Sequence, residues 1–137
     1  MTRYERSMAN PSSVSTPLGR YSQLARVKTG ELLFLAGQVA VDADGNMVGK
    51  GDVAAQVRQI YKNIGDVLKS AGAGFRNVVQ FTTYLPGREL VEPFLEARTE
   101  IVDELYPDGD FPPSTLLIVV GLQSEEMLAE VTTIAAI

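Results

Sequence analysis

An unbroken apolar segment, Leu-Leu-Ile-Val-Val at 116–120, dominates the last third of the chain. A run without a polar residue on either side of the pleat is typical of a strand that is buried on both faces. Two hydroxyl residues, Ser114 and Thr115, stand at its start, directly after Pro112 and Pro113. We therefore predict a central strand of a sheet here, with both of its faces covered.

Two segments show the spacing of apolar residues that is typical of helices. The first follows Asp52, a suitable N-cap residue, and ends at Ala71-Gly72. Its apolar stripe consists of Val53, Val57, Ile60, Ile64, Val67 and Leu68. The second is predicted to begin near Pro93 and to end before Pro107. Its inward residues are expected to be Phe94, Ala97, Ile101 and Leu105.

Shorter β-rich segments complete the pattern, at 21–27, 32–36, 39–41, 77–85 and 127–137. The first two flank a turn at Thr29-Gly30 and are predicted to form a hairpin, which Gly37 ends. A glycine at this point permits either a bulge or the close approach of another group to the backbone.

Residues 1–17 are polar and rich in Ser and Pro, which predicts a flexible N-terminal extension before a single domain at 18–137. The order β-β-(β)-α-β-α-β-β predicts an α+β fold, with about six strands in a mixed sheet and two helices on one face. A helix is about 10 Å across and strands lie about 4.8 Å apart, so two helices cover roughly four strands on one face only. Since monomers rarely expose large apolar patches, we expect the uncovered face to pack against copies of the same chain.

Charge and composition exclude several classes of function. The net charge of −5 argues against nucleic acid as a partner, because phosphate binding needs clustered Lys and Arg. The chain has no Cys and no His, which removes thiol nucleophiles, a Ser-His-Asp triad and the commonest zinc ligands. We expect no metal and no cofactor. The sequence has neither a signal-peptide core nor an apolar run long enough to cross a membrane, so we expect a cytoplasmic protein without a membrane partner.

Few residues suggest chemistry. Glu130 is an acid within the apolar and small-residue segment near the C-terminus, so it is either a general acid/base or water-positioning group, or an edge-strand carboxylate in solvent. Ser114 and Thr115 either bind a ligand carboxylate or close a turn. Tyr21 and Tyr84 are candidate ligand contacts, with a core or interface role as the alternative.

Four stretches, in this order and spacing, resemble the Rid (RidA, or YjgF) family over nearly the whole chain from about Leu18. They are Leu-Gly-Arg-Tyr-Ser-Gln at 18–23, Phe-Leu-Ala-Gly-Gln-Val at 34–39, the helix start at 52–59 with Ala71-Gly72 at its end, and Phe-Pro-Pro-Ser-Thr at 111–115 with Ala-Glu-Val at 129–131. The resemblance implies a chorismate-mutase-like α+β fold, assembled as a homotrimer with clefts between subunits.

Members of the deaminase type hydrolyse enamines or imines such as 2-aminoacrylate to a keto acid and ammonia. By position, the resemblance implies that Glu130 positions water and that the ligand contacts are Tyr21, Gly37, Tyr84, Ser114, Thr115 and Leu116. The family's carboxylate-binding arginine, however, falls on Ser114. Losing a bidentate arginine clamp costs several kcal/mol, or roughly 10²-fold or more in affinity.

We therefore expect a Rid-like trimer with a small-molecule site between subunits that is not an efficient 2-aminoacrylate deaminase. If it is an enzyme, it is a hydrolase of an imine, enamine or related small carbonyl compound; the alternative is a non-catalytic binding or regulatory trimer. Arg20 and Arg98 are the candidates to replace the missing arginine, although the sequence does not place them. The ribonuclease label given to some relatives fits poorly with an acidic chain without His.

Overall fold

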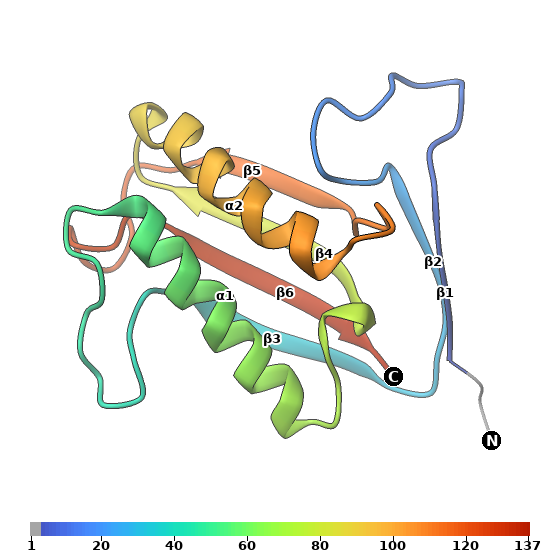
Figure 1. The fold of residues 1–137 in the computed structure, drawn as a ribbon, viewed down its shortest axis with the longest axis horizontal. Helices are drawn as coiled ribbons and strands as arrows, with labels where there is room; N and C mark the ends of the chain where they lie inside the picture. The colour runs from blue at the N-terminus through green and yellow to red at the C-terminus, as the bar shows by residue number, and fades with distance from the viewer. Residues whose placement is uncertain (1–3) are drawn as a thin grey trace.

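The computed structural model describes residues 4–137, which form six strands and two α-helices (Figure 1). The strands are β1 (Glu5–Ala9), β2 (Leu24–Lys28), β3 (Leu32–Gln38), β4 (Val78–Leu85), β5 (Ser114–Ile118) and β6 (Glu130–Ala136). The helices are α1 (Val53–Ser70) and α2 (Val91–Leu105), with short 3-10 turns η1 (Phe75–Asn77) and η2 (Arg88–Leu90). The predicted α+β class, the number of strands and the two helices are confirmed. The six strands are divided between a four-stranded and a two-stranded sheet.

The four-stranded sheet has the order β3-β6-β4-β5 and is mixed, because β4 and β5 are parallel and the other pairs are antiparallel. Both helices lie on the same face of this sheet, as Figure 1 shows. The hydrophobic core lies between them and the strand residues that point toward them, among which Phe81, Leu85 and Val131 are fully buried. In the part of the chain that the structure describes, no helix lies on the opposite face.

Local signals explain both helices. The Asp52 carboxylate accepts a hydrogen bond from the Ala55 N–H at 3.1 Å and so caps α1, while Gly72, at φ +74°, follows its end. The predicted stripe of α1 is buried except for Val67, which is exposed. The helix α2 begins two residues before Pro93 and ends two before Pro107, as predicted within its margins.

The apolar run at 116–120 is not a central strand, and this prediction was wrong. It contributes to β5, which lies at the sheet edge and, among the described strands, pairs with β4 alone, whereas β6 and β4 occupy the centre. Leu117 is 45% exposed and Val120 is fully exposed. An apolar run is typical of a strand that is buried on both faces, but it does not determine where the strand lies in the sheet.

The predicted hairpin of 21–27 with 32–36 is also wrong. Strand β2 pairs with β1, and β3 pairs with β6. The chain leaves one sheet for the other at Gly30 and Glu31, whose N–H groups both donate to the Ile137 carbonyl at 3.0 Å. The C-terminal residue therefore takes the hydrogen bonds that a hairpin partner would have supplied. Residues 39–41 add only an isolated bridge, between Val41 and Met47.

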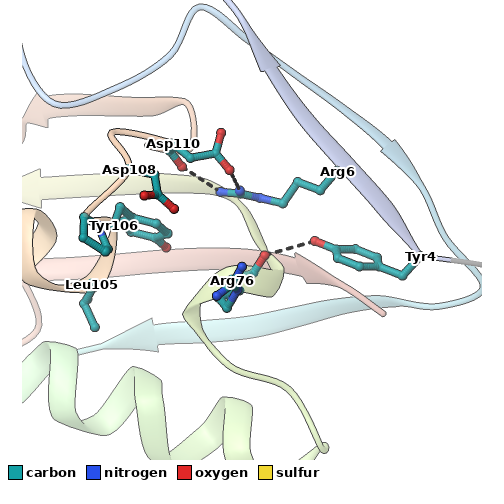
Figure 2. Close-up of a pocket in the computed structure, with 8 residues that line it drawn as sticks. Tyr4, Arg6, Arg76, Leu105, Tyr106, Asp108 and Asp110 are labelled. Atoms are coloured by element: carbon teal, nitrogen blue, oxygen red, sulfur yellow. Dashed lines mark hydrogen bonds and ion pairs between the residues drawn. The ribbon is translucent and has the colours of Figure 1, made fainter.

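Part of the predicted flexible extension is a strand. Within 1–17, residues Glu5–Ala9 form β1, while residues 1–3 lie outside the described residues. Arg6 connects this strand to the rest of the chain, because its Nη1 lies 2.5 Å from the Asp110 carboxylate (Figure 2). Its Nε also donates to the Val78 carbonyl at 2.9 Å. The segment Glu-Arg-Ser-Met-Ala has no apolar alternation, so its pairing depends on these distant partners.

Candidate functional site

The predicted site residues lie on both faces of the four-stranded sheet. Ser114 and Leu116 are paired in register with Phe81 and Thr83, so they share the face that carries the helices. Thr115 is paired with Thr82, one position along the strand, and is exposed on the helix-free face. Tyr84 and Glu130 are opposite each other across β4 and β6, also on the helix-free face.

Glu130 and Gly37 are close together on the helix-free face. Gly37 lies in the bulge that shifts the register of β3 between Leu35 and Gln38. A Cβ atom at this position would overlap the Glu130 carboxylate and lie 2.9 Å from its Cδ. Gly37 therefore both belongs to a bulge and leaves room for the Glu130 carboxylate. The bulge and the close approach of another group, which the sequence left as alternatives, occur together. Within residues 4–137, no basic group lies within 4.0 Å of Glu130.

On the other face, a pocket of about 350 Å³ opens between α2, β5 and the segment 18–21. It is lined by Leu18, Gly19, Arg20, Tyr21, Thr83, Val91, Phe94, Leu95, Arg98, Ser114 and Leu116. Three predicted ligand contacts, Tyr21, Ser114 and Leu116, therefore share one cavity. The Tyr21 hydroxyl accepts a hydrogen bond from the Leu18 N–H at 3.2 Å, which folds this segment back on itself.

Arg98 extends from α2 to this pocket and is only 5% exposed. Its Nε donates to the Tyr61 hydroxyl at 3.2 Å, and its Nη1 and Nη2 both donate to the Arg20 carbonyl at 3.3 Å. Burial raises the pKa of Tyr61, and the Arg98 charge opposes that rise without cancelling it, so the phenol stays protonated. The Arg20 side chain pairs with Asp103 at 3.2 Å on the surface.

The structure thus brings both candidate arginines to the pocket that contains Ser114. One feature of the sequence could have predicted the inward position of Arg98. Arg98 stands four residues after Phe94, on the apolar stripe of the helix, where a charge is unexpected. Thr83 and Phe94 are pocket residues that sequence reasoning did not assign to a site, because a strand Thr and a core Phe are ordinary at such positions.

A second pocket, of about 300 Å³, lies between β1 and the segment after α2 (Figure 2). Its polar groups are largely engaged with one another: Arg6 pairs with Asp110, and the Tyr4 hydroxyl donates to the Arg76 carbonyl at 3.1 Å. Burial raises the pKa of Tyr106, whose hydroxyl donates to the Phe75 carbonyl at 2.8 Å. None of the predicted site residues lies here, and we interpret this region as the anchor of β1.

Two further features bear on function. Within the described range, neither helix combines the length and the apolar character that crossing a lipid bilayer requires. The part of the chain at 4–137 also contains no group of three or more acidic residues that could hold a metal ion.

Comparison with known proteins assigns the chain to a family. The model of the Endoribonuclease L-PSP family matches residues 12–137. A RutC family protein of Pyrococcus abyssi is 31% identical over 119 residues, which are 87% of each chain. The 2-iminobutanoate/2-iminopropanoate deaminase of Rattus norvegicus is 33% identical over 85 residues, which are 62% of this chain and 61% of that protein.

A solved structure agrees with the sequence matches. The structure of YyfB of Yersinia pestis, described as a member of the conserved Rid protein family, has a TM-score of 0.86 at 28% identity and covers 96% of this chain and 98% of its own. The RidA of a Psychrobacter species has a TM-score of 0.67 at 24% identity, over 89% of this chain and 92% of its own, and supports the fold alone. Together, the family model, the RutC relative and the Rid structure show that this chain belongs to the Rid family.

Proposed function

We propose that this protein is a homotrimer with a small-molecule site between its subunits, and that this site hydrolyses a small imine, enamine or related carbonyl compound. The observation that carries the proposal is the division of the predicted site residues into two half-sites. One is the pocket with Tyr21 and Ser114, which has no acid in its lining. The other is the pair Gly37 and Glu130 on the opposite face, where the carboxylate has no cation from residues 4–137. An assembly that seats one half-site of each subunit against the other half-site of its neighbour would complete the site.

Exposed apolar side chains support self-association at these surfaces. Phe34 is 72% exposed, Leu32 54% and Leu117 45%, and all three point to the helix-free face. Leu18, at the rim of the pocket, is 91% exposed. Contiguous apolar patches beyond a few hundred Å² are rare on monomers. A second copy of the chain would cover β5 as well, which accounts for the unbroken apolar run of an edge strand.

The proposed chemistry requires only a carboxylate and water. The substrate reacts as its protonated imine, and Glu130 holds a water molecule and accepts a proton from it as the water oxygen adds to the carbon of the C=N bond. The resulting carbinolamine carries the hydroxyl and a neutral amino group on one carbon. Glu130 gives that proton to the amino nitrogen, the C–N bond breaks with release of ammonia, and the carboxylate takes the hydroxyl proton as the C=O bond forms and passes it to solvent. The rat relative's name, 2-iminobutanoate/2-iminopropanoate deaminase, supports the imine class.

We expect poor activity toward 2-aminoacrylate in particular, because Ser114 stands where the Rid deaminase pattern has an arginine. A serine hydroxyl offers one neutral hydrogen bond instead of a bidentate charged pair. This substitution is also what favours the alternative, a trimer that binds a small molecule without turnover. We further propose a cytoplasmic location, since the chain has no Cys. RNA cleavage is not favoured, because the net charge is −5 and there is no His.

An assay in which an amino-acid oxidase generates imines tests the proposal, with release of the keto acid followed over time. We expect Glu130→Gln, which keeps the size of the side chain, to lower kcat/KM by roughly 10²-fold or more. Glu125→Gln, at an exposed position outside the site, is the matched control. Unchanged turnover in Glu130→Gln would exclude the role of this carboxylate.

Two more measurements complete the test. Light scattering should give about three times the chain mass of 14.8 kDa, and a single-chain mass at micromolar concentration would refute the assembly. Ser114→Arg should raise deamination of 2-aminoacrylate; no gain would show that the pocket differs from the deaminase type at more than this position. If no imine is hydrolysed while small ligands still raise Tm, the binding alternative is correct.

A further inference from the structure

We propose that the pocket beside Ser114 binds a small monocarboxylate with an apolar side chain, and that Arg98 on α2 supplies the charge that grips its carboxylate. This inference deepens the proposed function and rests on it for the identity of the ligand pocket. It assigns to the site an anionic ligand, held from the helix side of the pocket and not from the start of β5.

The first argument is the unpaired charge of Arg98. The side chain is 5% exposed, and within residues 4–137 no carboxylate lies within 4.0 Å of it. Its three hydrogen bonds all go to neutral oxygens, namely the Tyr61 hydroxyl and the Arg20 carbonyl. A guanidinium has five N–H donors, so two remain for another acceptor. A buried charge is costly unless it is paired, and a bound anion would provide the missing partner.

The second argument is the charge of the pocket as a whole. Its lining contains two arginines, Arg20 and Arg98, and no acidic residue, although the chain as a whole has a net charge of −5. The Arg20 side chain pairs with Asp103, which is outside this lining, and both of these side chains are about half exposed. Arg98 is therefore the buried cation of this cavity. A positive pocket in an acidic protein attracts anions and excludes cationic ligands.

The remaining lining defines the rest of the ligand. Val91, Phe94, Leu95 and Leu116 provide apolar walls, while the hydroxyl groups of Thr83 and Ser114 provide neutral hydrogen bonds. A volume of about 350 Å³ is near the lower end of ligand pockets, about 300–1,000 Å³, so the ligand is small. An inorganic phosphate would leave the apolar walls without a partner. The chemistry therefore favours a 2-oxo or 2-imino acid whose aliphatic side chain is large enough to contact these walls, and so larger than the single methylene carbon of 2-aminoacrylate.

Equilibrium binding to the full chain tests this inference without reference to turnover. The probes are 4-methyl-2-oxopentanoate, its uncharged methyl ester and inorganic phosphate, each measured by calorimetry. We expect the acid to bind roughly 10- to 100-fold more tightly than the ester, the range that one or more charged hydrogen bonds provide. We also expect phosphate to bind much more weakly than the acid.

Substitutions of Arg98 separate a charge effect from a structural one. Arg98→Met should remove the preference for acid over ester, and Arg98→Lys should retain part of it. Arg58→Met, at an exposed position on α1, is the matched control and should bind as the unmodified protein does. If Arg98 only supports the Arg20 carbonyl, Arg98→Met will weaken acid and ester equally, and the ratio of the two Kd values will not change.

The outcomes distinguish this inference from the proposed function. Equal affinity for acid and ester in the unmodified protein, no binding of the acid, tight phosphate binding, or an unchanged ratio in Arg98→Met would each overturn the assignment of Arg98. Hydrolysis of imines that does not depend on Arg98 would leave the proposed function standing without this inference. Binding of the acid through Arg98 without turnover would support this inference and refute the hydrolase.

Discussion

Replacing Gly37 by alanine tests whether the Glu130 carboxylate is positioned by the absence of a side chain at 37. The added Cβ would lie 2.9 Å from Cδ and 3.1 Å from Cγ of Glu130, well inside the ordinary separation of about 3.5–4.0 Å. Gly37 does not have a positive φ, so alanine introduces no backbone strain. The half-buried glutamate must therefore move, because it is the more adjustable partner.

The expected effect on stability is small, since two terms oppose each other. Forcing the glutamate from its preferred rotamer costs about 0.5–1.5 kcal/mol. Restricting the unfolded chain by Gly→Ala contributes about 0.4–1 kcal/mol in the other direction. We therefore expect the free energy of unfolding, measured by urea denaturation, to change by less than about 1 kcal/mol.

The effect on imine hydrolysis should be much larger. A displacement of about 1 Å in a catalytic group can lower the rate by roughly 10²-fold, so we expect kcat/KM to fall by about that factor. Gly121→Ala is the control, because a Cβ there meets nothing within 4 Å. A loss of more than about 2 kcal/mol in stability would show that the bulge backbone itself requires glycine. Unchanged hydrolysis with unchanged stability would refute the idea that Gly37 positions Glu130.

Three further predictions concern the anchor of β1, the assembly and the buried phenols. Arg6→Met should lower the free energy of unfolding by about 1–3 kcal/mol, because it leaves the Val78 carbonyl without its hydrogen-bond donor. The ion pair with Asp110 adds little, since that carboxylate is half exposed. Urea denaturation of this variant and of the control Arg58→Met measures the effect, and equal stability of the two variants would contradict it. Phe34→Asp should reduce the mass measured by light scattering to that of one chain without unfolding it, since Phe34 is 72% exposed; a mass that stays at three chains would exclude this face from the interface. Burial raises the pKa values of Tyr61 and Tyr106 above 10.0, so the folded state keeps protons that the unfolded state loses, and the free energy of unfolding should fall as pH rises above about 10. Urea midpoints between pH 8 and 11 measure this, and Tyr106→Phe should flatten the decline; a midpoint independent of pH would count against both assignments.

Local patterns predicted the elements that are stabilised by neighbours in sequence. Asp52, the apolar stripe after it and Gly72 define α1 through contacts within a few residues, and the structure follows them closely. Strand β1 was not predicted, because its contacts are with residues that are distant in sequence. Its polar segment is held by Arg6, whose partners Val78 and Asp110 lie more than 70 residues away.

In the candidate site, too, the sequence predicted which residues are involved but not how they are arranged in space. Family-like spacing singled out Gly37, Ser114 and Glu130, but no pattern along the chain shows which face of the sheet each one occupies. That depends on strand order and on the bulge in β3, because a shift of one residue moves a side chain to the other face. The position of Arg98 in the pocket with Ser114 likewise follows from the packing of α2 over the sheet.

The sequence by itself determined the α+β class and the two helices, because apolar spacing and capping residues act within a few positions along the chain, and the order of its motifs determined the family. Only the tertiary structure decided that β5 is an edge strand and that the Ile137 carbonyl accepts the N–H groups of Gly30 and Glu31 between β2 and β3. It also placed Arg98, a buried arginine with no carboxylate partner within residues 4–137, in the lining of the pocket. These features depend on pairings between distant segments, whose hydrogen-bonding groups are the same at every residue and therefore leave no local signature.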